Sequence, residues 1–482
     1  MLRKCKTLIN YFRLKSDVIT ILKLRTELID KAVKLIHIKE NTNVSKQEVN
    51  IAFNLYEELQ KINESKKFKF YPFNEKEASE FSLADFSKDA KKITRLRNWV
   101  LEVLPIIDLY NQVGNLPLTR ENDDFIEYLK DCFNTYISGL ESICSATLET
   151  VITNKDLEHV KDLCNGIINS LKEYYKGFPS KAFKEFHRVL INNVSIPNHF
   201  NDIKTLQNYD NELFYKMRVG TDHVFTSEEM FHILLQLRGI VSTNRYSIPG
   251  LPCIYLGSSP LTCWEELNKP DLNTVQTSVF KSDDISYIDL STPPVVFIDK
   301  IIKKFYDFGT IMKKRLFADK LNEPNEVISY LIIWPLMAAC SVRVKNTTDT
   351  FKPEYIIPQL LLQFIRQDDF FDGVSYFSTK VDNYSAATAA LYKNFAFPVQ
   401  DGENKGLCPK LLSKFDVSDA VPWNMFQLYK DSHHCDPHEG EKRVEHEFIN
   451  GMSLLYSSTD FSKLETFLHN KFLLERSNGR LS

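Results

Sequence analysis

The stretch RYSIPGLPCIYLGSSPLTCWEEL, from Arg245 to Leu267, predicts a compact unit of turn, strand and helix. Its Pro-Gly pair favours a turn, and the alternation in LPCIYL is typical of a short strand. Ser259 followed by Pro260 is a typical helix start, because serine accepts hydrogen bonds from free backbone amides and proline is tolerated at the first helical position. We therefore expect a helix from Ser259 to about Asn268.

Two adjacent acids close this unit, and periodicity does not choose between them. At about 100° per residue, the apolar residues of the helix form one arc; they are Leu261, Cys263, Trp264 and Leu267. Glu265 and Glu266 flank this arc on opposite sides. The ordinary interpretation is a solvated pair in which Arg245 contacts one of the acids.

The order of an arginine, a tyrosine ten residues later and a glutamate eleven residues after that resembles the RES domain family, which is named for its Arg, Glu and Ser. Three matches carry the resemblance: the pair Arg245-Tyr246, the motif GLPCIY that ends at Tyr255, and Ser259 four residues further on. The glutamate at the family's position is Glu266. The family also has an aromatic after the arginine, often Trp, where this chain has Tyr.

The serine of the family follows a Gly-Ile-x-Tyr-x-Ser pattern, and FDGVSYFSTK supplies a similar one. It selects Ser378 rather than Ser375. An upstream arginine on the first strand is matched by Arg218 in FYKMRVG. The resemblance covers residues of about 210 to 400, and the long segment between the glutamate and the serine predicts a helical insertion at about 295–350.

The resemblance implies an α+β fold similar to that of ADP-ribosyltransferases and an enzyme that breaks the nicotinamide-ribose bond of NAD. It also implies a bacterial toxin or a defence effector that depletes NAD. NAD is then the substrate, and no cofactor or metal is implied. Water as acceptor would give a glycohydrolase, inorganic phosphate a phosphorylase, and a protein an ADP-ribosyltransferase; the sequence leaves these open. The alternative from a different class is a non-catalytic protein that binds a nucleotide and contacts partners through its helices.

The family's residues carry specific roles. Glu266 would stabilise the positive charge that grows on the ribose, and Ser378 would position by hydrogen bonding. Arginines would bind the diphosphate or an acceptor phosphate, and aromatic rings would stack on the nicotinamide or ribose. The expected catalytic residues are Glu266, Arg245, Tyr255 and Ser378. The expected ligand-binding residues are Arg218, Arg245, Tyr246, Tyr255 and Ser259.

Length and texture predict a multi-domain protein. The chain has 482 residues, of which 43% are hydrophobic, enough for two or three domains. Apolar spacing is helical from about 15 to 195, a polar stretch at 197–210 is typical of a linker, and strands and helices alternate beyond it. We expect an all-α region at 1–200, a RES-type catalytic domain at 201–425, and a polar loop with a C-terminal helix at 426–482.

Composition limits the partners. The formal charge is −3 and no long basic run occurs, so nucleic acid is not expected as a partner. Nine scattered cysteines, no secretory signal and no apolar run of about twenty residues predict a soluble cytoplasmic protein without a membrane partner. The resemblance implies a helix-turn-helix antitoxin or another regulatory protein, encoded elsewhere, and leaves a homo-oligomer open.

Two further patterns are set aside. The histidines in DSHHCDPHEGEKRVEHEF match no zinc spacing, and Asp, Pro and Gly indicate a polar loop. Arg218 and His223 have the R-x4-H spacing of a helical ribonuclease class, but Gly220 argues against a helix there, so a ribonuclease is not expected.

Overall fold

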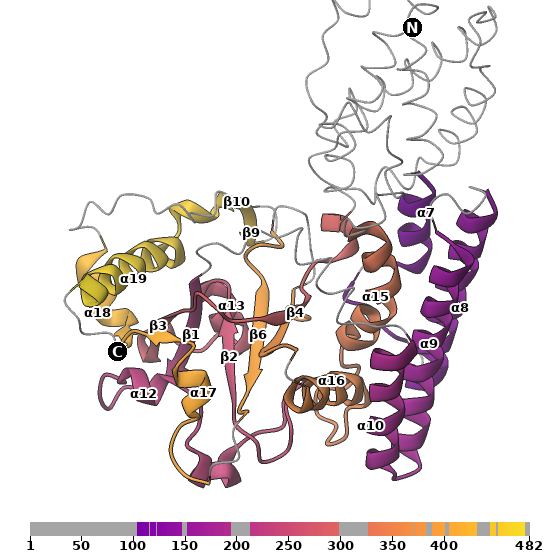
Figure 1. The fold of residues 1–482 in the computed structure, drawn as a ribbon. Coiled ribbons are helices and arrows are strands. Elements are labelled where there is room, and N and C mark those ends of the chain that lie inside the picture. Colours follow the sequence, from indigo (N-terminus) through magenta and orange to yellow (C-terminus); the bar gives the residue numbers. More distant parts are fainter. Residues whose placement is uncertain are drawn as a thin grey trace, which may run out of the picture. The chain divides into compact units, whose positions relative to one another are not determined.

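The structure is a computed structural model, shown in Figure 1. It describes residues 104–114, 116–121, 123–146, 152–193, 213–297, 326–368, 370–381, 388–400, 404–430, 444–449 and 452–477. The helices expected between 15 and 103, the linker at 197–210, half of the insertion at 295–350 and the polar loop at 431–443 lie outside these ranges.

The described residues form two compact units, each discontinuous in sequence. The first contains residues 104–118, 127–165, 293–297 and 326–335. The second contains residues 119–126, 166–193, 213–292 and the described residues from 336 to 477. The division falls within three helices, α8, α9 and α15.

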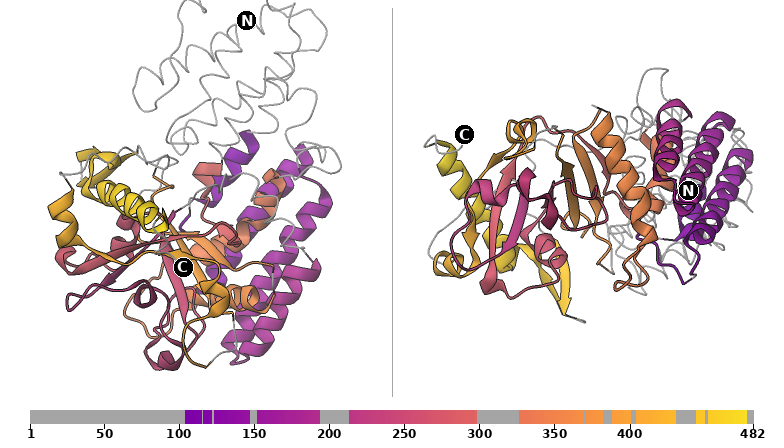
Figure 2. Two further views of the ribbon diagram at one scale, coloured as in Figure 1. Left: turned by 60° about the vertical axis from the view of Figure 1, so that its left-hand side comes forward. Right: turned by 90° about the horizontal axis from the view of Figure 1, so that it is seen from below.

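The first unit is helical. It includes α7 (Leu104–Val113), most of α8 (Phe125–Ala146), and parts of α9 (Asn154–Tyr175) and α15 (Glu326–Ser341). Helices α8 and α9 lie side by side in Figures 1 and 2 and are linked by the Lys161–Glu141 ion pair at 2.6 Å. Stacked aromatic rings, with Tyr136 4.1 Å from Trp334 between centroids, fill the core. Helix α8 lies where helical apolar spacing was expected, and α15 lies within the helical insertion expected at about 295–350.

The second unit contains a mixed sheet in the order β4-β5-β6-β2-β1-β3-β7, with β8 also beside β3. Strands β4 and β5 are parallel, and the other neighbours are antiparallel. The strands are β1 (Leu213–Val219), β2 (Cys253–Gly257), β3 (Val275–Lys281), β4 (Tyr287–Leu290), β5 (Gly373–Phe377), β6 (Lys393–Pro398), β7 (Asp416–Val417) and β8 (Val421–Pro422). The expectation of a helical region together with an α+β region is confirmed.

The helices and the remaining strands of this unit are short except at the C-terminus. They are α10 (Pro179–Arg188), a π-helical turn (Val189–Asn193), α12 (Ser227–Met230), α13 (Pro260–Glu266), α16 (Ile356–Gln367), α17 (Pro409–Leu412), α18 (Trp423–Tyr429), α19 (Asp460–Ser477) and the hairpin β9 (Glu445–Ile449) and β10 (Met452–Leu455). Single 3-10 turns lie at Leu235–Ile240, Leu272–Thr274, Pro353–Tyr355 and Tyr456–Ser458.

The two faces of the sheet bury different clusters, because successive side chains of a strand point to opposite sides. Phe214 of β1 packs with Leu256 and Phe395 in one cluster, which also includes Leu411 of α17. Tyr215, the next residue, packs in the other cluster, which is covered by α13, α18 and α19. We call these the Phe214 face and the Tyr215 face.

The compact units differ from the predicted domain boundaries. The boundary expected at 425 falls within α18, and α19 belongs to the sheet unit because its Leu464 and Leu468 are buried in the same cluster as Val279 of β3. Helix α10, expected in the N-terminal region, packs on α16 in the sheet unit. The sequence predicted boundaries at polar, aperiodic stretches. Burial of apolar side chains nevertheless places α10 and α19 in the same unit as the sheet.

The cysteines and the apolar character of the helices can be followed in the described residues. The seven cysteines there are free, and six of them are buried. No helix in these ranges combines the length and the apolar character that a membrane crossing needs.

A buried ion pair ties β4, β5 and the segment after α17 together. Asp372 Oδ2 accepts from Ser286 N at 2.9 Å, from Ser286 Oγ at 3.0 Å and from Lys414 Nζ at 2.6 Å. The side chain of Asp372 is 7% exposed and that of Lys414 is 19% exposed. Burial alone raises the pKa of Asp372, but the Lys414 and Ser286 donors outweigh it and hold the pKa below its ordinary value.

Replacing Lys414 by Met should lower the free energy of unfolding by roughly 3 kcal/mol, because a buried carboxylate loses its counter-charge. The double variant Lys414→Met/Asp372→Asn should lose less than Lys414→Met alone. Because the folded pKa of Asp372 is depressed, its contribution is present above about pH 4 and is lost as the pH falls further. Urea unfolding at pH 7 and below pH 4 measures both effects; a Lys414→Met variant as stable as wild type would contradict the first.

Candidate functional site

The predicted turn, strand and helix are confirmed between residues 248 and 266. Gly250 has φ 71°, a left-handed conformation that glycine adopts without strain, and Leu251 N donates to Ile248 O at 2.9 Å across the turn. Strand β2 leads directly into α13. At Gly257 a Cβ atom would lie 2.8 Å from Cys263 Sγ, so only glycine lets the helix approach the strand end this closely.

Ser259 begins α13 and is fully buried. Its Oγ accepts a hydrogen bond from Thr262 N at 3.1 Å and donates to Leu391 O at 2.9 Å. The expected helix cap is confirmed. The expected role in ligand binding is corrected, because this hydroxyl is used by the protein and the residue presents no surface to a ligand.

Glu266 is held at the end of α13 by one residue that follows β5 and one residue of β6. Ser378, which follows β5, donates from Oγ to Glu266 Oε1 at 2.6 Å across 112 residues of sequence. Asn394 of β6 donates from Nδ2 to the same oxygen at 2.8 Å. The glutamate side chain is 34% exposed. The structure therefore brings the predicted glutamate and serine into direct contact.

Ser375, the alternative to Ser378, lies on the other side of the sheet. It pairs with Phe395 of β6, whose ring packs in the Phe214 cluster, and it is fully buried. The strand period of two therefore separates the two serines. Only Ser378 contacts the glutamate.

Glu265, the other acid, has different surroundings. Its carboxylate pairs with Lys269 Nζ at 3.1 Å and is 15% exposed. Its charge also acts on Tyr392, whose hydroxyl lies 2.7 Å from His446 Nε2. Burial lowers the pKa of His446 below its ordinary value. The two adjacent acids thus have separate sets of contacts. This agrees with the prediction that they lie on opposite sides of the apolar arc of the helix.

Arg245 is anchored through one nitrogen. Its Nη1 donates to Cys340 O at 3.1 Å and to Glu354 O at 3.4 Å, and its guanidinium lies 5.2 Å from the ring centroid of Tyr355. Within the described ranges, Nε and Nη2 have no protein acceptor. This guanidinium is half-buried and can still form a forked contact with an anion.

A buried ion pair supports the segment beneath this arginine. Arg120 Nη2 lies 2.7 Å from Glu354 Oε1, and the two side chains are 7% and 1% exposed. Because Glu354 is in the turn Pro353–Tyr355, this pair fixes both the carbonyl that accepts from Arg245 and the ring of Tyr355. The segment that accepts from the arginine is thus itself anchored by a buried ion pair.

Three tyrosines connect Arg245 with Glu266. Tyr255 donates its hydroxyl to Tyr246 O at 2.6 Å, and the ring of Tyr246 lies 4.2 Å from that of Tyr376. Burial, and then the charge of Glu266, raise the pKa of Tyr376, while the charge of Arg245 opposes this shift. Tyr376 is therefore within electrostatic reach of both predicted charged residues.

The rings of Tyr246 and Tyr255 differ in access. Tyr246 is only 1% exposed, so the expectation that it contacts a ligand is corrected: its ring packs against Tyr376. Tyr255 is half-buried, and it shares the Tyr215 face with Asn394, because Gly257 pairs with Asn394 and lies two residues after Tyr255. Tyr255 remains available for contact with a ligand.

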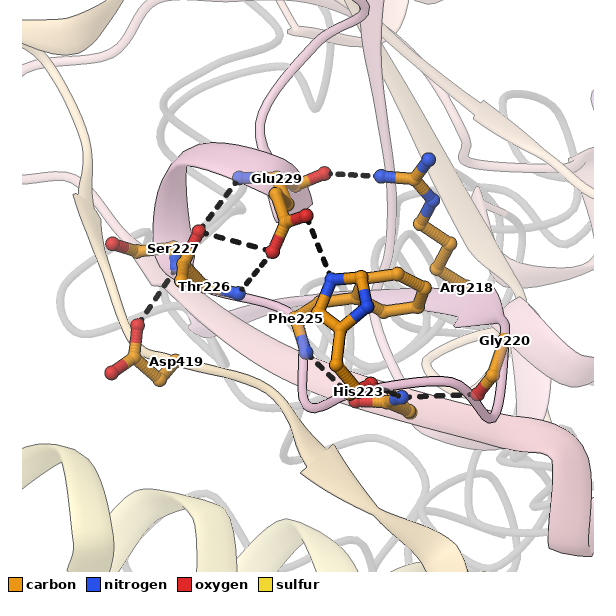
Figure 3. A network of polar contacts seen from close by, with 9 residues as sticks. Arg218, Gly220, His223, Phe225, Thr226, Ser227, Glu229 and Asp419 are labelled. Carbon is orange, nitrogen blue, oxygen red and sulfur yellow. Dashed lines mark hydrogen bonds and ion pairs between the residues drawn. The ribbon is translucent and has the colours of Figure 1, made fainter.

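Arg218 does not join this group. As an even-numbered residue of β1 it shares the Phe214 face, whereas the pairing of Tyr215 with Gly257 places the site on the other face. Figure 3 shows its contacts: Nη1 donates to Glu229 O at 2.7 Å, and the guanidinium lies 4.6 Å from the Phe225 ring. The expected role of Arg218 in ligand binding beside Arg245 is therefore corrected.

The same view shows His223 beside Arg218. His223 Nε2 lies 2.8 Å from Glu229 Oε1, and its ring packs edge-on against Phe225. Glu229 is also part of a capping box with Thr226. These contacts hold the exposed loop after β1. Arg218 is in strand β1 and His223 is in this loop, so neither residue is in a helix, and their contacts give both a structural role.

Sequence reasoning missed three contacts of the site. Asn394 belongs to no motif that the sequence revealed. Lys380 follows Ser378 by two residues, and its Nζ donates to Glu266 O at 2.7 Å and to Asn268 Oδ1 at 2.8 Å. Tyr355 lies in the 3-10 turn before α16, where no sequence pattern indicated a role. Each of these three residues contacts a partner more than 100 residues away in the sequence, so no local pattern could reveal it.

No group of three metal-ligating side chains occurs in the described part of the chain. Most of the histidine-rich stretch, residues 431–443, falls outside that part. Of its histidines, only His446 is described, where it contacts Tyr392.

The second unit thus defines an α+β protein in which a glutamate and a serine are in contact beside a mixed sheet, and packed tyrosines lie near both this pair and an arginine. The chain belongs to the family of the Bacillus subtilis (strain 168) protein named "Putative toxin YopC". The two are 34% identical over 389 residues, which is 78% of this chain and 83% of the relative. No protein-family model matches the sequence, and no solved structure matches it.

Replacing Ser259 by Ala should lower the free energy of unfolding by about 1–2 kcal/mol, because α13 loses its N-terminal cap. Ser413→Ala is the matched control: this exposed hydroxyl donates only to Lys410 O, and its loss should change stability by less than about 0.5 kcal/mol. Urea unfolding of both variants measures the difference. Equal stability of the two would mean that Ser259 does not cap the helix.

Proposed function

We propose that the sheet unit is a RES-type catalytic domain that cleaves NAD at the nicotinamide-ribose bond. The observation that carries the proposal is the contact between Glu266 and Ser378, the two residues that the resemblance selected from distant parts of the chain. Arg245 and Tyr255 lie in the same group of contacts, connected through Tyr246 and Tyr376.

The chemistry needs little beyond an oriented anion. When the bond between the ribose C1′ and the pyridinium nitrogen breaks, the electron pair stays with the nitrogen, so nicotinamide leaves neutral and needs no general acid. Positive charge grows on the ribose. A carboxylate held in place stabilises that charge without reorganising at the moment of reaction. Glu266, oriented by two hydrogen bonds, has this property.

The acceptor completes the reaction. Attack by water at C1′ forms ADP-ribose and releases one proton; attack by inorganic phosphate forms the 1-phosphate of ADP-ribose; a protein side chain would become ADP-ribosylated. Arg245 would bind the diphosphate of NAD through the donors that have no described protein acceptor. Tyr255 would provide the stacking surface.

The family supports a role as a toxin. The Bacillus subtilis relative bears the name of a toxin, and depletion of NAD would arrest a cell without any second activity. We accordingly propose that this chain is a toxin that acts by NAD cleavage. Expression of the wild-type chain from a tightly controlled promoter should stop growth while cellular NAD falls; growth arrest with unchanged NAD would contradict this mechanism.

Replacing Glu266 by Gln should reduce nicotinamide release by about 10²–10³-fold or more, because the change removes charge but keeps volume. Glu265→Gln is the matched control and should retain activity within about threefold. Purified protein is incubated with NAD, with and without phosphate, and nicotinamide and the ribosyl product are quantified by chromatography. An active Glu266→Gln variant would exclude the proposed role; the ribosyl product identifies the acceptor.

Replacing Arg245 by Gln should raise KM for NAD by about 10–100-fold, the loss expected for one or two charge-assisted hydrogen bonds. Arg218→Gln makes the same chemical change on the opposite face of the sheet and should leave KM within about twofold. Initial rates over a range of NAD concentrations separate the two. A larger effect at Arg218 would show that the ligand binds on the Phe214 face.

A further inference from the structure

The carboxylate of Glu266 is held asymmetrically. Oε1 accepts from both Ser378 and Asn394, which fills the two lone-pair positions of one carboxylate oxygen. The contact of Oε2 within the described ranges is Lys380 Nζ at 3.5 Å, longer than the roughly 2.7–2.9 Å of a strong charge-assisted hydrogen bond. Oε2 is therefore the oxygen that remains free to face a substrate.

Asn394 can impose this orientation because its own position is constrained by pairing and burial. It lies on β6 between two paired strands, opposite Gly257 of β2 and Tyr376 of β5, and it is 4% exposed. A buried amide in the middle of a sheet has little freedom to follow the carboxylate. The carboxylate must follow the amide, so the sheet sets its rotation.

Lys380 holds the backbone that carries the glutamate. Beyond Glu266 the chain turns through two left-handed residues, Asn268 with φ 62° and Lys269 with φ 56°, a conformation that costs free energy for residues other than glycine. The Nζ of Lys380 donates to Glu266 O at 2.7 Å and to Asn268 Oδ1 at 2.8 Å. A cation at the carboxyl end of α13 also complements the helix dipole.

We propose that Asn394 and Lys380 are positioning residues: Asn394 sets the rotation of the Glu266 carboxylate, Lys380 fixes the helix end that bears it, and together they direct Oε2 toward the ribose of the dinucleotide. This inference rests on the proposed NAD cleavage. It adds two residues that the Arg, Tyr, Glu and Ser pattern does not contain, and it identifies which carboxylate oxygen stabilises the growing charge.

The kinetic test measures nicotinamide release by Asn394→Ala and Asn394→Asp, and by Lys380→Met and Lys380→Arg. Both Asn394 variants should lower kcat at least tenfold with KM within about threefold, because the effect belongs to the transition state. Lys380→Met should lower kcat severalfold, and Lys380→Arg should recover most of it. Wild-type kcat in the Asn394 variants, or a loss confined to KM, would overturn the proposal.

Two matched controls accompany these variants. Lys269→Met removes the ion pair of the neighbouring acid, Glu265, and Asn273→Ala removes an exposed amide that contacts Asp271. Both should keep kcat within about twofold of wild type. Equal losses in controls and test variants would overturn the assignment to Asn394 and Lys380.

A double-mutant cycle tests the contact between Asn394 and Glu266, which we call the clamp, without any enzymatic assay. Asn394→Ala should lower Tm by about 2–4 °C in the wild-type chain and by less than half as much in the Glu266→Ala background, because the partner is already absent. Equal shifts in both backgrounds would overturn the clamp. If wild-type protein released no nicotinamide, the proposed function would fail, and this cycle alone would decide whether the clamp exists.

Discussion

The site depends on one carboxylate oxygen that accepts two hydrogen bonds, one from β6 and one from the residue that follows β5. Ser378 and Asn394 reach Glu266 only because β5 and β6 pair in the register that sets Tyr376 opposite Asn394. A shift of one residue would turn Asn394 to the Phe214 face and leave the carboxylate without that donor. The register of two strands, more than 100 residues beyond α13, therefore decides how Glu266 is held.

The division of the sheet into two faces explains which predicted residues join the site. Tyr255 shares the Tyr215 face with Asn394, whereas Arg218 and Ser375 share the Phe214 face with phenylalanines. Because successive side chains of a strand point to opposite faces, a residue next to a site residue in the sequence can lie on the other side of the sheet, outside the site. A family pattern that names residues without their faces cannot make this distinction.

Buried ion pairs stabilise the segments around the sheet. Arg120 with Glu354 fixes the turn that contacts Arg245, and Lys414 with Asp372 joins β5 to the chain after α17. Each pair has further hydrogen bonds to the backbone, which offset the cost of removing charge from water. Polar contacts of this kind define one arrangement of irregular segments that apolar packing alone would leave free to slide.

The sequence by itself determined the local structure: the Pro-Gly turn, the β2 strand, the cap at Ser259 and the opposite flanks of Glu265 and Glu266. These follow from propensity and periodicity over a few residues, and the resemblance added the distant Ser378. Only the tertiary structure decided that Asn394 and Lys380 hold Glu266, that Tyr246 is buried, and that Arg218 faces away. The reason is physical: strand register and the packing of α13 and α19 depend on contacts between residues far apart in the chain, which no local pattern records.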